Sequence, residues 1–261
     1  MNRKKMLTIA MSAAVAAGNI LNDHSNDFLK ASSKESFRDI VTEVDKYAEN
    51  EIIKILKMHD SSIPFLSEES RFIEGINEKD YQWIVDALDG TVNYVNHIPF
   101  YAVSIALMEK GRPVVGVIYN PMLGDLYYGA EGIGVYKNHA KIKIRDGKEE
   151  ETLFAVAFSG KNYDPLKRSK EFLMFGKVND STRGCLRTGS AAMNLAYLTE
   201  GKFGGCWGKA NKIWDVAAGI LLAKLAGAVV EYKTINKEKN LISYIAVVPS
   251  ALKFLKGKVR L

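Results

Sequence analysis

An apolar segment that runs directly into two carboxylates constrains the fold of this chain more than any other feature. Residues 83–93 read WIVDALDGTVN, so an apolar run ends at Asp86 and Asp89 follows three positions later. The run predicts a buried strand that delivers Asp86 to the edge of a sheet, with a turn that brings Asp89 back beside it. Gly90 and Thr91 come next and favour a helical turn whose backbone can closely approach an anion.

Acidic residues also stand at the boundaries of two further apolar segments. Glu68 and Glu69 follow a short predicted strand, and Asp215 follows Trp214 near the start of a predicted helix. Carboxylates gathered in this way suit a divalent cation, and no His or Cys accompanies them, which favours Mg²⁺ or Mn²⁺ over Zn²⁺. Each acid alone also has an ordinary explanation, since Asp commonly forms turns and helix caps and a Glu pair is commonly an exposed loop.

The rest of the chain alternates helical and strand patterns, which indicates the α/β class. A charged stretch at 137–151 is the best candidate for a boundary between two parts of the chain. We therefore expect two packed halves, 1–140 and 141–261. An antiparallel meander is expected over 102–136. Helices are predicted at about 7–21, 43–58, 165–176, 190–200 and 216–226, and further strands at 63–66, 153–159, 183–187 and 228–232.

Charge and cysteine content narrow the function classes. Lys and Arg number 36 against 30 Asp and Glu, a net charge of +6 that is too small and too dispersed for a dedicated nucleic-acid binder. Cys185 and Cys206 lack the spacing of a zinc site, so free thiols in a reducing compartment are expected. The basic and then apolar start of the chain imitates an export signal, but its helical spacing favours an ordinary first helix. We therefore expect a cytoplasmic protein without a membrane partner.

With these motifs in order, the sequence resembles the inositol monophosphatase family. The match extends from about residue 34 to 230 and includes a segment similar to the substrate side of the family's site. The matching motifs are VTEVD at 41–45, EES at 68–70, DALDGT at 86–91, RTGSAA at 187–192 and WDVAAG at 214–219.

The resemblance implies a layered αβαβα sandwich, like that of inositol monophosphatase and fructose-1,6-bisphosphatase, and Mg²⁺-dependent hydrolysis of a phosphate monoester. Two or three Mg²⁺ ions are implied, with Mn²⁺ as a substitute, and a homodimer. The metal ligands that the resemblance implies are the side chains of Glu68, Asp86, Asp89 and Asp215 and the carbonyl oxygen of Leu88. It implies that water is activated by Thr91 with Asp45 and Glu68, and that phosphate is bound by Gly90 and Thr91. The implied substrate contacts are Gly189, Ser190, Ala191, Lys209 and Asp215.

The sequence departs from the family pattern at two places. Ala87 stands where the family usually has Pro, which should loosen the turn slightly. In the segment 206–212 many inositol-directed members have a carboxylate, whereas this chain has Gly208 with Lys209 and Lys212 nearby. A cationic rim would favour a more anionic substrate, although both lysines could equally face solvent.

Inositol monophosphate, a small-molecule phosphate ester, is the substrate that we expect first. No nucleic-acid partner is expected. Fructose 1,6-bisphosphate, a 3′-phosphoadenosine nucleotide and NADP are the alternatives. A phosphatase with a covalent Asp nucleophile fits poorly, because two residues separate Asp86 from Asp89, whereas one residue separates the two Asp of that class. The non-enzymatic alternative is a catalytically inactive, anion-binding regulator with the same fold.

Overall fold

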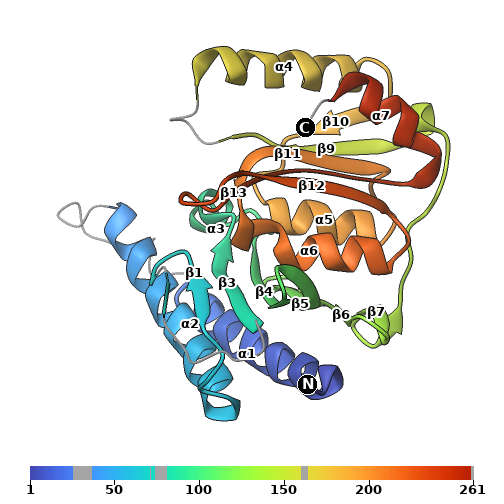
Figure 1. Ribbon diagram of the computed structural model, residues 1–261. Coiled ribbons are helices and arrows are strands. Elements are labelled where there is room, and N and C mark those ends of the chain that lie inside the picture. Colours follow the sequence, from blue (N-terminus) through green and yellow to red (C-terminus); the bar gives the residue numbers. More distant parts are fainter. Residues whose placement is uncertain (26–36, 71, 74–80, 160–163, 260–261) are drawn as a thin grey trace.

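The computed structural model describes residues 1–25, 37–70, 72–73, 81–159 and 164–259 and arranges them in five layers (Figure 1). Two helices cover the outer face of a first sheet, two lie between the sheets, and two cover the outer face of a second sheet. This order confirms the predicted αβαβα sandwich. The outer pairs are α1 (Arg3–Asp23) with α2 (Phe37–His59) and α4 (Pro165–Asn179) with α7 (Leu252–Lys258), and the inner pair is α5 (Ala191–Thr199) with α6 (Ile213–Leu225).

The first sheet is built almost entirely from the first half of the chain. Its strand order is β2-β1-β3-β4-β5-β6-β7-β8, and the pairing is antiparallel except between β1 and β3. The predicted meander is confirmed as β4 to β7. The strands are β1 (Phe65–Ser67), β2 (Phe72–Ile73), β3 (Tyr81–Asp89), β4 (Ala102–Glu109), β5 (Arg112–Asn120), β6 (Asp125–Ala130), β7 (Gly134–Lys137) and β8 (Ala140–Lys141).

The second sheet has the order β10-β9-β11-β13-β12, and two of its central strands were not predicted. Strand β11 mixes glycines, lysines and an asparagine, so its sequence lacks the regular alternation of a strand. The second of these strands is β13, and helix α7 was also not predicted. The strands are β9 (Leu153–Ala157), β10 (Gly184–Leu186), β11 (Gly205–Lys212), β12 (Val229–Asn236) and β13 (Leu241–Val247).

Helix α1 is a packed element of the core, as its spacing predicted. Ala10, Ala13, Ala14 and Ala17 are fully buried, and a Cβ added at Gly18 would lie 2.4 Å from the Tyr119 ring. Small side chains therefore let this helix come close to the sheet. Among the described residues, none of the helices combines the length and the apolar character needed to cross a bilayer.

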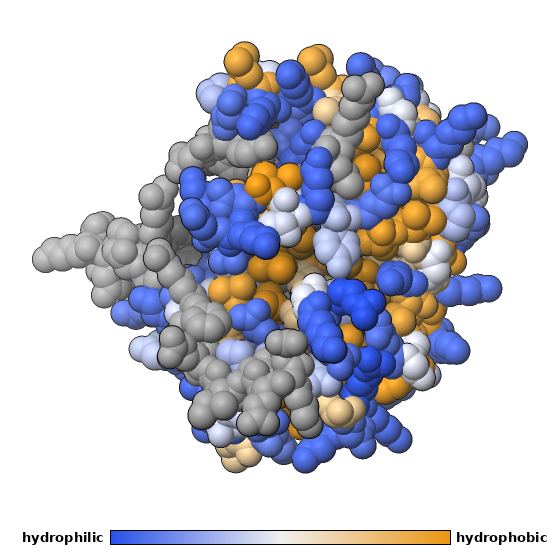
Figure 2. Space-filling model, in the orientation of Figure 1, coloured by the Kyte–Doolittle hydropathy of each residue, from blue (hydrophilic) through white to orange (hydrophobic). Residues whose placement is uncertain are grey.

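On the face seen in Figure 2, hydrophilic side chains dominate the margin and apolar ones gather mostly toward the middle. The core itself continues across the inner layer, because α6 packs on β3, β4 and β5 as well as on the second sheet. Helices from the second half of the chain thus complete the core of the first. The division at 140/141 remains a prediction.

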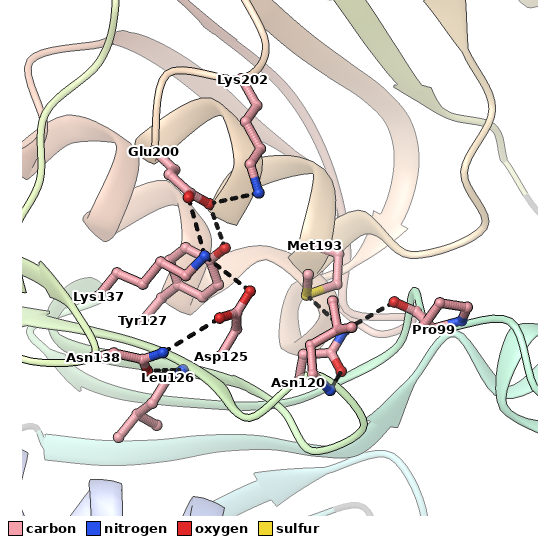
Figure 3. A network of polar contacts seen from close by, with 11 residues as sticks. Pro99, Asn120, Asp125, Leu126, Tyr127, Lys137, Asn138, Met193, Glu200 and Lys202 are labelled. Atoms are coloured by element: carbon pink, nitrogen blue, oxygen red, sulfur yellow. Dashed lines mark hydrogen bonds and ion pairs between the residues drawn. The ribbon is translucent and has the colours of Figure 1, made fainter.

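A polar network fastens the C-terminal end of α5 to the first sheet (Figure 3). Lys137 lies between two carboxylates, with its Nζ 2.9 Å from Asp125 and 3.0 Å from Glu200. Tyr127 donates a 2.6 Å hydrogen bond to Glu200, which is the C-cap residue of α5. The network fixes one end of a helix whose other end enters the site described below.

Lys137→Met should lower the free energy of unfolding by about 1–3 kcal/mol, because Asp125 and Glu200 would lose the cation that lies between them. The Lys137 side chain is only 17% exposed, so solvent compensates little. Denaturant unfolding measures the change. Lys202→Met is the matched control, since Lys202 pairs with the same Glu200 but is 44% exposed, and it should cost at most about 1 kcal/mol. Equal losses in the two variants would contradict the role given to Lys137.

Candidate active site

The parallel pairing of β1 with β3 brings the first two predicted carboxylates together. Ser67, the last residue of β1, pairs with Val85, so Glu68 and Asp86 follow at the same edge of the sheet. Asp86 is buried, at 2% exposure. The predicted turn between Asp86 and Asp89 is wrong: β3 continues to Asp89, and its pairing with β4 is irregular between these two residues. A bulge of this kind re-aims side chains without ending the strand.

Asp215 joins this pair from the inner helix layer. It lies in the first turn of α6, which packs on β3 and β4. Glu68, Asp86 and Asp215 each offer one carboxylate oxygen, and these oxygens lie within 4.8 Å of one another. The Trp214 ring nitrogen donates to Glu68 at 3.0 Å and so orients that carboxylate. Three of the predicted metal ligands therefore converge.

The Asp86 carboxylate fits a cation ligand particularly well. Its Oδ1 accepts a 2.9 Å hydrogen bond from the Leu88 backbone N–H, whereas its Oδ2 is buried and has no hydrogen-bond partner among the described residues. Burial, and then the charges of Glu68 and Asp215, raise the pKa of Asp86 well above its ordinary value. An unpaired buried carboxylate is costly unless it is protonated or meets a cation. Its hard oxygen donors suit Mg²⁺.

Asp89 is held by the start of α5. Ser190 donates a 2.5 Å hydrogen bond to Asp89 Oδ2 from its hydroxyl, and the backbone N–H of Ala192 donates another at 2.7 Å. Burial raises the pKa of Asp89 to about 6, although these donors oppose the shift. One oxygen of this carboxylate is thus engaged by the predicted substrate segment, and Asp89 lies outside the group of three. Its role as a metal ligand remains a prediction.

Asp45 lies on α2 among the same acids. Burial, followed by the charges of Glu69 and Glu68, raises its pKa to about 8. The Thr91 hydroxyl donates to the Leu88 carbonyl oxygen at 3.3 Å, so its proton is not directed at Asp45 in this structure. The roles predicted for Thr91 and Asp45 in activating water, and for the Leu88 carbonyl as a ligand, remain predictions. The side chains of Val41 and Thr42, which begin this motif, lie outside the described residues.

The backbone at Gly90 is built for close packing. Gly90 has φ 95°, in the left-handed region, and immediately precedes the short helix α3 (Thr91–Val95). A Cβ there would lie 3.1 Å from both the Phe100 carbonyl oxygen and Tyr101 Cβ. This confirms the expected helical turn at Gly90–Thr91. The phosphate contact of these two residues remains a prediction.

A cavity of about 160 Å³ opens beside the acidic cluster, and most of the predicted substrate residues line it. Its wall includes a backbone segment that Asn93 supports by donating to the Thr188 carbonyl oxygen at 2.8 Å. A Cβ at Gly189 would lie 2.9 Å from that Asn93 amide nitrogen. The cavity is lined by Asp89, Val156, Ala157, Phe158, Arg187, Gly189, Ser190, Ala191, Asn211 and Asp215.

The two lysines of the predicted cationic rim have different surroundings. Lys212 Nζ donates to the Lys239 carbonyl oxygen. Burial raises the pKa of Glu68 and of Asp215, and the charge of Lys212 opposes part of this increase. Lys209 is not among the residues that line the cavity. Burial lowers the pKa of Lys209, and the charge of Glu171 opposes this decrease. A direct contact of Lys209 with substrate remains a prediction.

Glu49 is a site residue that sequence analysis missed. It is 1% exposed on α2, and its carboxylate accepts backbone hydrogen bonds from Glu69 at 3.1 Å and Ser70 at 2.9 Å. These bonds fix the loop that begins with Glu68. An acid four positions after Asp45 in a helix lies on the same face, which is the signal that could have identified it.

Comparisons with known proteins agree with this geometry. A model of the inositol monophosphatase family matches residues 2–255. The chain belongs to the inositol monophosphatase family. The Nus factor SuhB of Haemophilus influenzae is 33% identical over 259 residues, covering 98% of this chain and 96% of SuhB. The SuhB of Escherichia coli K12 is 37% identical over 232 residues, covering 86% and 84% of the two chains.

A solved inositol monophosphatase from Anabaena superposes with a TM-score of 0.85 at 31% identity, over 99% of this chain and 96% of that one. The fold of this family member is therefore that of solved inositol monophosphatases along its whole length. Family membership supports a phosphatase type of protein with a metal-binding acidic site. The relatives named Nus factor show that family membership alone does not define the role.

The metal-free protein should become less stable as pH rises from about 4 to about 8. Asp45 and Asp89 have folded pKa values of about 8 and about 6 against an ordinary 3.8, so the folded state holds more protons than the unfolded state in this range. The free energy of unfolding then falls with pH. Thermal denaturation in chelator at pH 5 to 8 measures this, and Asp45→Asn should flatten the slope. A Tm in chelator that rises over this range would contradict it.

Proposed function

We propose that this chain hydrolyses a phosphate monoester with the help of Mg²⁺ held by Glu68, Asp86 and Asp215. The observation that carries the proposal is the convergence of these three carboxylates around a buried Asp86 oxygen without a protein partner. Mg²⁺ bound there would lower the pKa of a water molecule and offset charge on the phosphate and on the leaving oxygen. The alternative explanation of each acid as a cap or turn former does not account for three like charges gathered around a buried carboxylate.

The surrounding residues position the reacting groups. Trp214 orients Glu68, and Ser190 with Ala192 orients Asp89, so neither carboxylate needs to reorganise when substrate arrives. The Gly90–Thr91 backbone would receive the phosphate at the start of α3. We propose Thr91 and Asp45, with Glu68, as the groups that accept and hold the proton of the attacking water. The cavity beside Asp215 would hold the alcohol part of the ester.

Inositol monophosphate is the substrate that we propose first. Fructose 1,6-bisphosphate, a 3′-phosphoadenosine nucleotide and NADP are alternatives within the same reaction, because Arg187 and Lys212 place positive charge near the cavity. The cytoplasmic location and the homodimer predicted from the sequence belong to this proposal too. Light scattering coupled to size-exclusion chromatography would test the homodimer.

Phosphate release tests the proposal directly. Purified protein is incubated with each of the four esters in Mg²⁺, and again after removal of Mg²⁺ with chelator. Release that requires Mg²⁺ is expected with at least one ester. No release from any of them, with folded protein and with Mg²⁺ binding established by calorimetry, would reject it in favour of an anion-binding regulator. The name Nus factor of the SuhB relatives makes such a non-catalytic role the second candidate.

A further inference from the structure

A second cavity shares none of its described lining residues with the cavity beside the acidic cluster. Its volume is about 390 Å³, within the range of about 300–1,000 Å³ that is usual for small-molecule sites. Its wall combines residues of the first sheet with the start of α6 and the β12–β13 hairpin. Half of the described lining is apolar and consists of Leu66, Ile84, Met108, Ile213 and Ile242.

The polar part of the lining carries a single charge. Lys237 is the one charged residue that lines the cavity within the described part of the chain, and it lies in the turn of the β12–β13 hairpin. Gln82, Thr234 and Asn240 add neutral polar groups. An apolar wall with one cation matches a ligand that has an apolar body and one negative charge.

The turn that borders this cavity is fixed to the start of α6. The Ile213 backbone N–H donates to the Asn240 carbonyl oxygen at 3.0 Å. Lys212 Nζ donates to the Lys239 carbonyl oxygen at 3.0 Å, and the Lys239 N–H donates to Asn236 Oδ1 at 2.9 Å. These bonds hold two parts of the wall together without a ligand. A cavity formed in advance costs a ligand less ordering than one that must be assembled.

The cavity borders the elements that carry the acidic cluster but contains none of its carboxylates. Three of its apolar lining residues each stand two positions before one of these acids. The pairs are Leu66 with Glu68, Ile84 with Asp86, and Ile213 with Asp215. A ligand in this cavity would therefore lie close to the candidate active site without occupying it.

We propose that this cavity is a second ligand site, which takes a small amphipathic anion with an apolar body and one acidic group. The apolar residues would cover the body, and Lys237 would pair with the acidic group. No carboxylate lines the cavity within the described residues, so an anion meets attraction there without an opposing charge. The inference concerns binding alone and does not depend on phosphatase activity.

Two fluorescent probes test the site. Anilinonaphthalene sulfonate and N-phenylnaphthylamine share an aromatic body, and only the first carries an acidic group. Lys237→Met should raise the Kd of the sulfonate by about 5-fold, a modest factor because Lys237 is exposed and solvent screens its charge. The Kd of the uncharged amine should stay near its wild-type value. Lys239→Met is the matched control, since it removes an exposed lysine of the same turn that does not line the cavity, and it should change neither Kd.

Thr234→Trp tests the position of the probes. Thr234 is exposed on β12, so the larger side chain can enter the cavity mouth without disturbing the core. It should raise the Kd of both probes by about 10-fold or more. Thermal denaturation of each variant should give a Tm near that of wild type, because all three replaced side chains are exposed.

Four results would overturn the inference. They are a sulfonate that does not bind the wild-type protein, equal losses in Lys237→Met and Lys239→Met, undiminished binding in Thr234→Trp, and displacement of the sulfonate by inorganic phosphate in the presence of Mg²⁺. The last would place the probe in the cavity beside the acidic cluster. Because no turnover is measured, failure of the proposed function would leave this test unaffected.

Discussion

Asp86→Asn should reduce Mg²⁺-dependent phosphate release by about 10²–10³-fold or more while leaving the metal-free protein at least as stable as wild type. Asn Oδ1 can still accept the hydrogen bond from the Leu88 N–H, so the backbone keeps its support. The new amide group can donate to Glu68 and Asp215, which only repel the original carboxylate. Activity at saturating Mg²⁺ and the Tm in chelator measure the two effects.

Asp164→Asn is the matched control for this experiment. Asp164 caps α4 through its side-chain oxygen, which an Asn provides equally well, so both activity and stability should remain near wild type. Activity that survives Asp86→Asn at the wild-type level would exclude the acidic cluster from catalysis. A large loss of stability in chelator would instead mean that the cluster is structural.

Glu49→Gln should weaken Mg²⁺ binding or activity by about 10–100-fold, although Glu49 is not one of the proposed ligands. Its carboxylate accepts from two backbone N–H groups of the loop that begins with Glu68, and a glutamine can turn only one oxygen toward them. We also expect a loss of about 1–3 kcal/mol in the free energy of unfolding. Activity measured over a range of Mg²⁺ concentrations should show a higher half-saturating value.

Glu51→Gln separates this positioning role from a general effect of charge on α2. Glu51 lies one half-turn further along the helix and pairs with the exposed Lys54, so its removal should cost about 0.5 kcal/mol or less. The Mg²⁺ dependence should then remain that of wild type. If Glu49→Gln and Glu51→Gln shift that dependence equally, the hydrogen bonds to Glu69 and Ser70 do not position the loop.

The sequence predicted those parts of the site that follow from local patterns. Asp86 and Asp215 sit where an apolar run meets a carboxylate, and a change of residue type of this kind is readable directly from the sequence. The motif DALDGT also located the short helix at Thr91. The five-layer order followed from the family resemblance, which depends on motifs spread along the chain rather than on the periodicity of any one segment.

Other parts depend on contacts between residues far apart in sequence and could not be read locally. Asn93 supports Thr188, and Glu49 supports the loop at Glu69, but neither residue stands at the end of an apolar run. The bulge that replaced the expected turn after Asp86 is set by pairing with β4. Strand β11 was missed because its glycines, lysines and asparagine interrupt the regular alternation expected of a strand.

If the acidic cluster binds Mg²⁺ as proposed, metal affinity would report whether the two halves of the chain have packed together, because the inner helix layer supplies part of the site. Glu68 and Asp86 belong to the first sheet, whereas Asp215 and the Ser190 that holds Asp89 belong to α6 and the start of α5. A growing chain on the ribosome, or a proteolytic fragment that ends before α5, contains the first acids without these partners. Resistance to proteolysis should therefore rise with added Mg²⁺ only in a chain that includes α6.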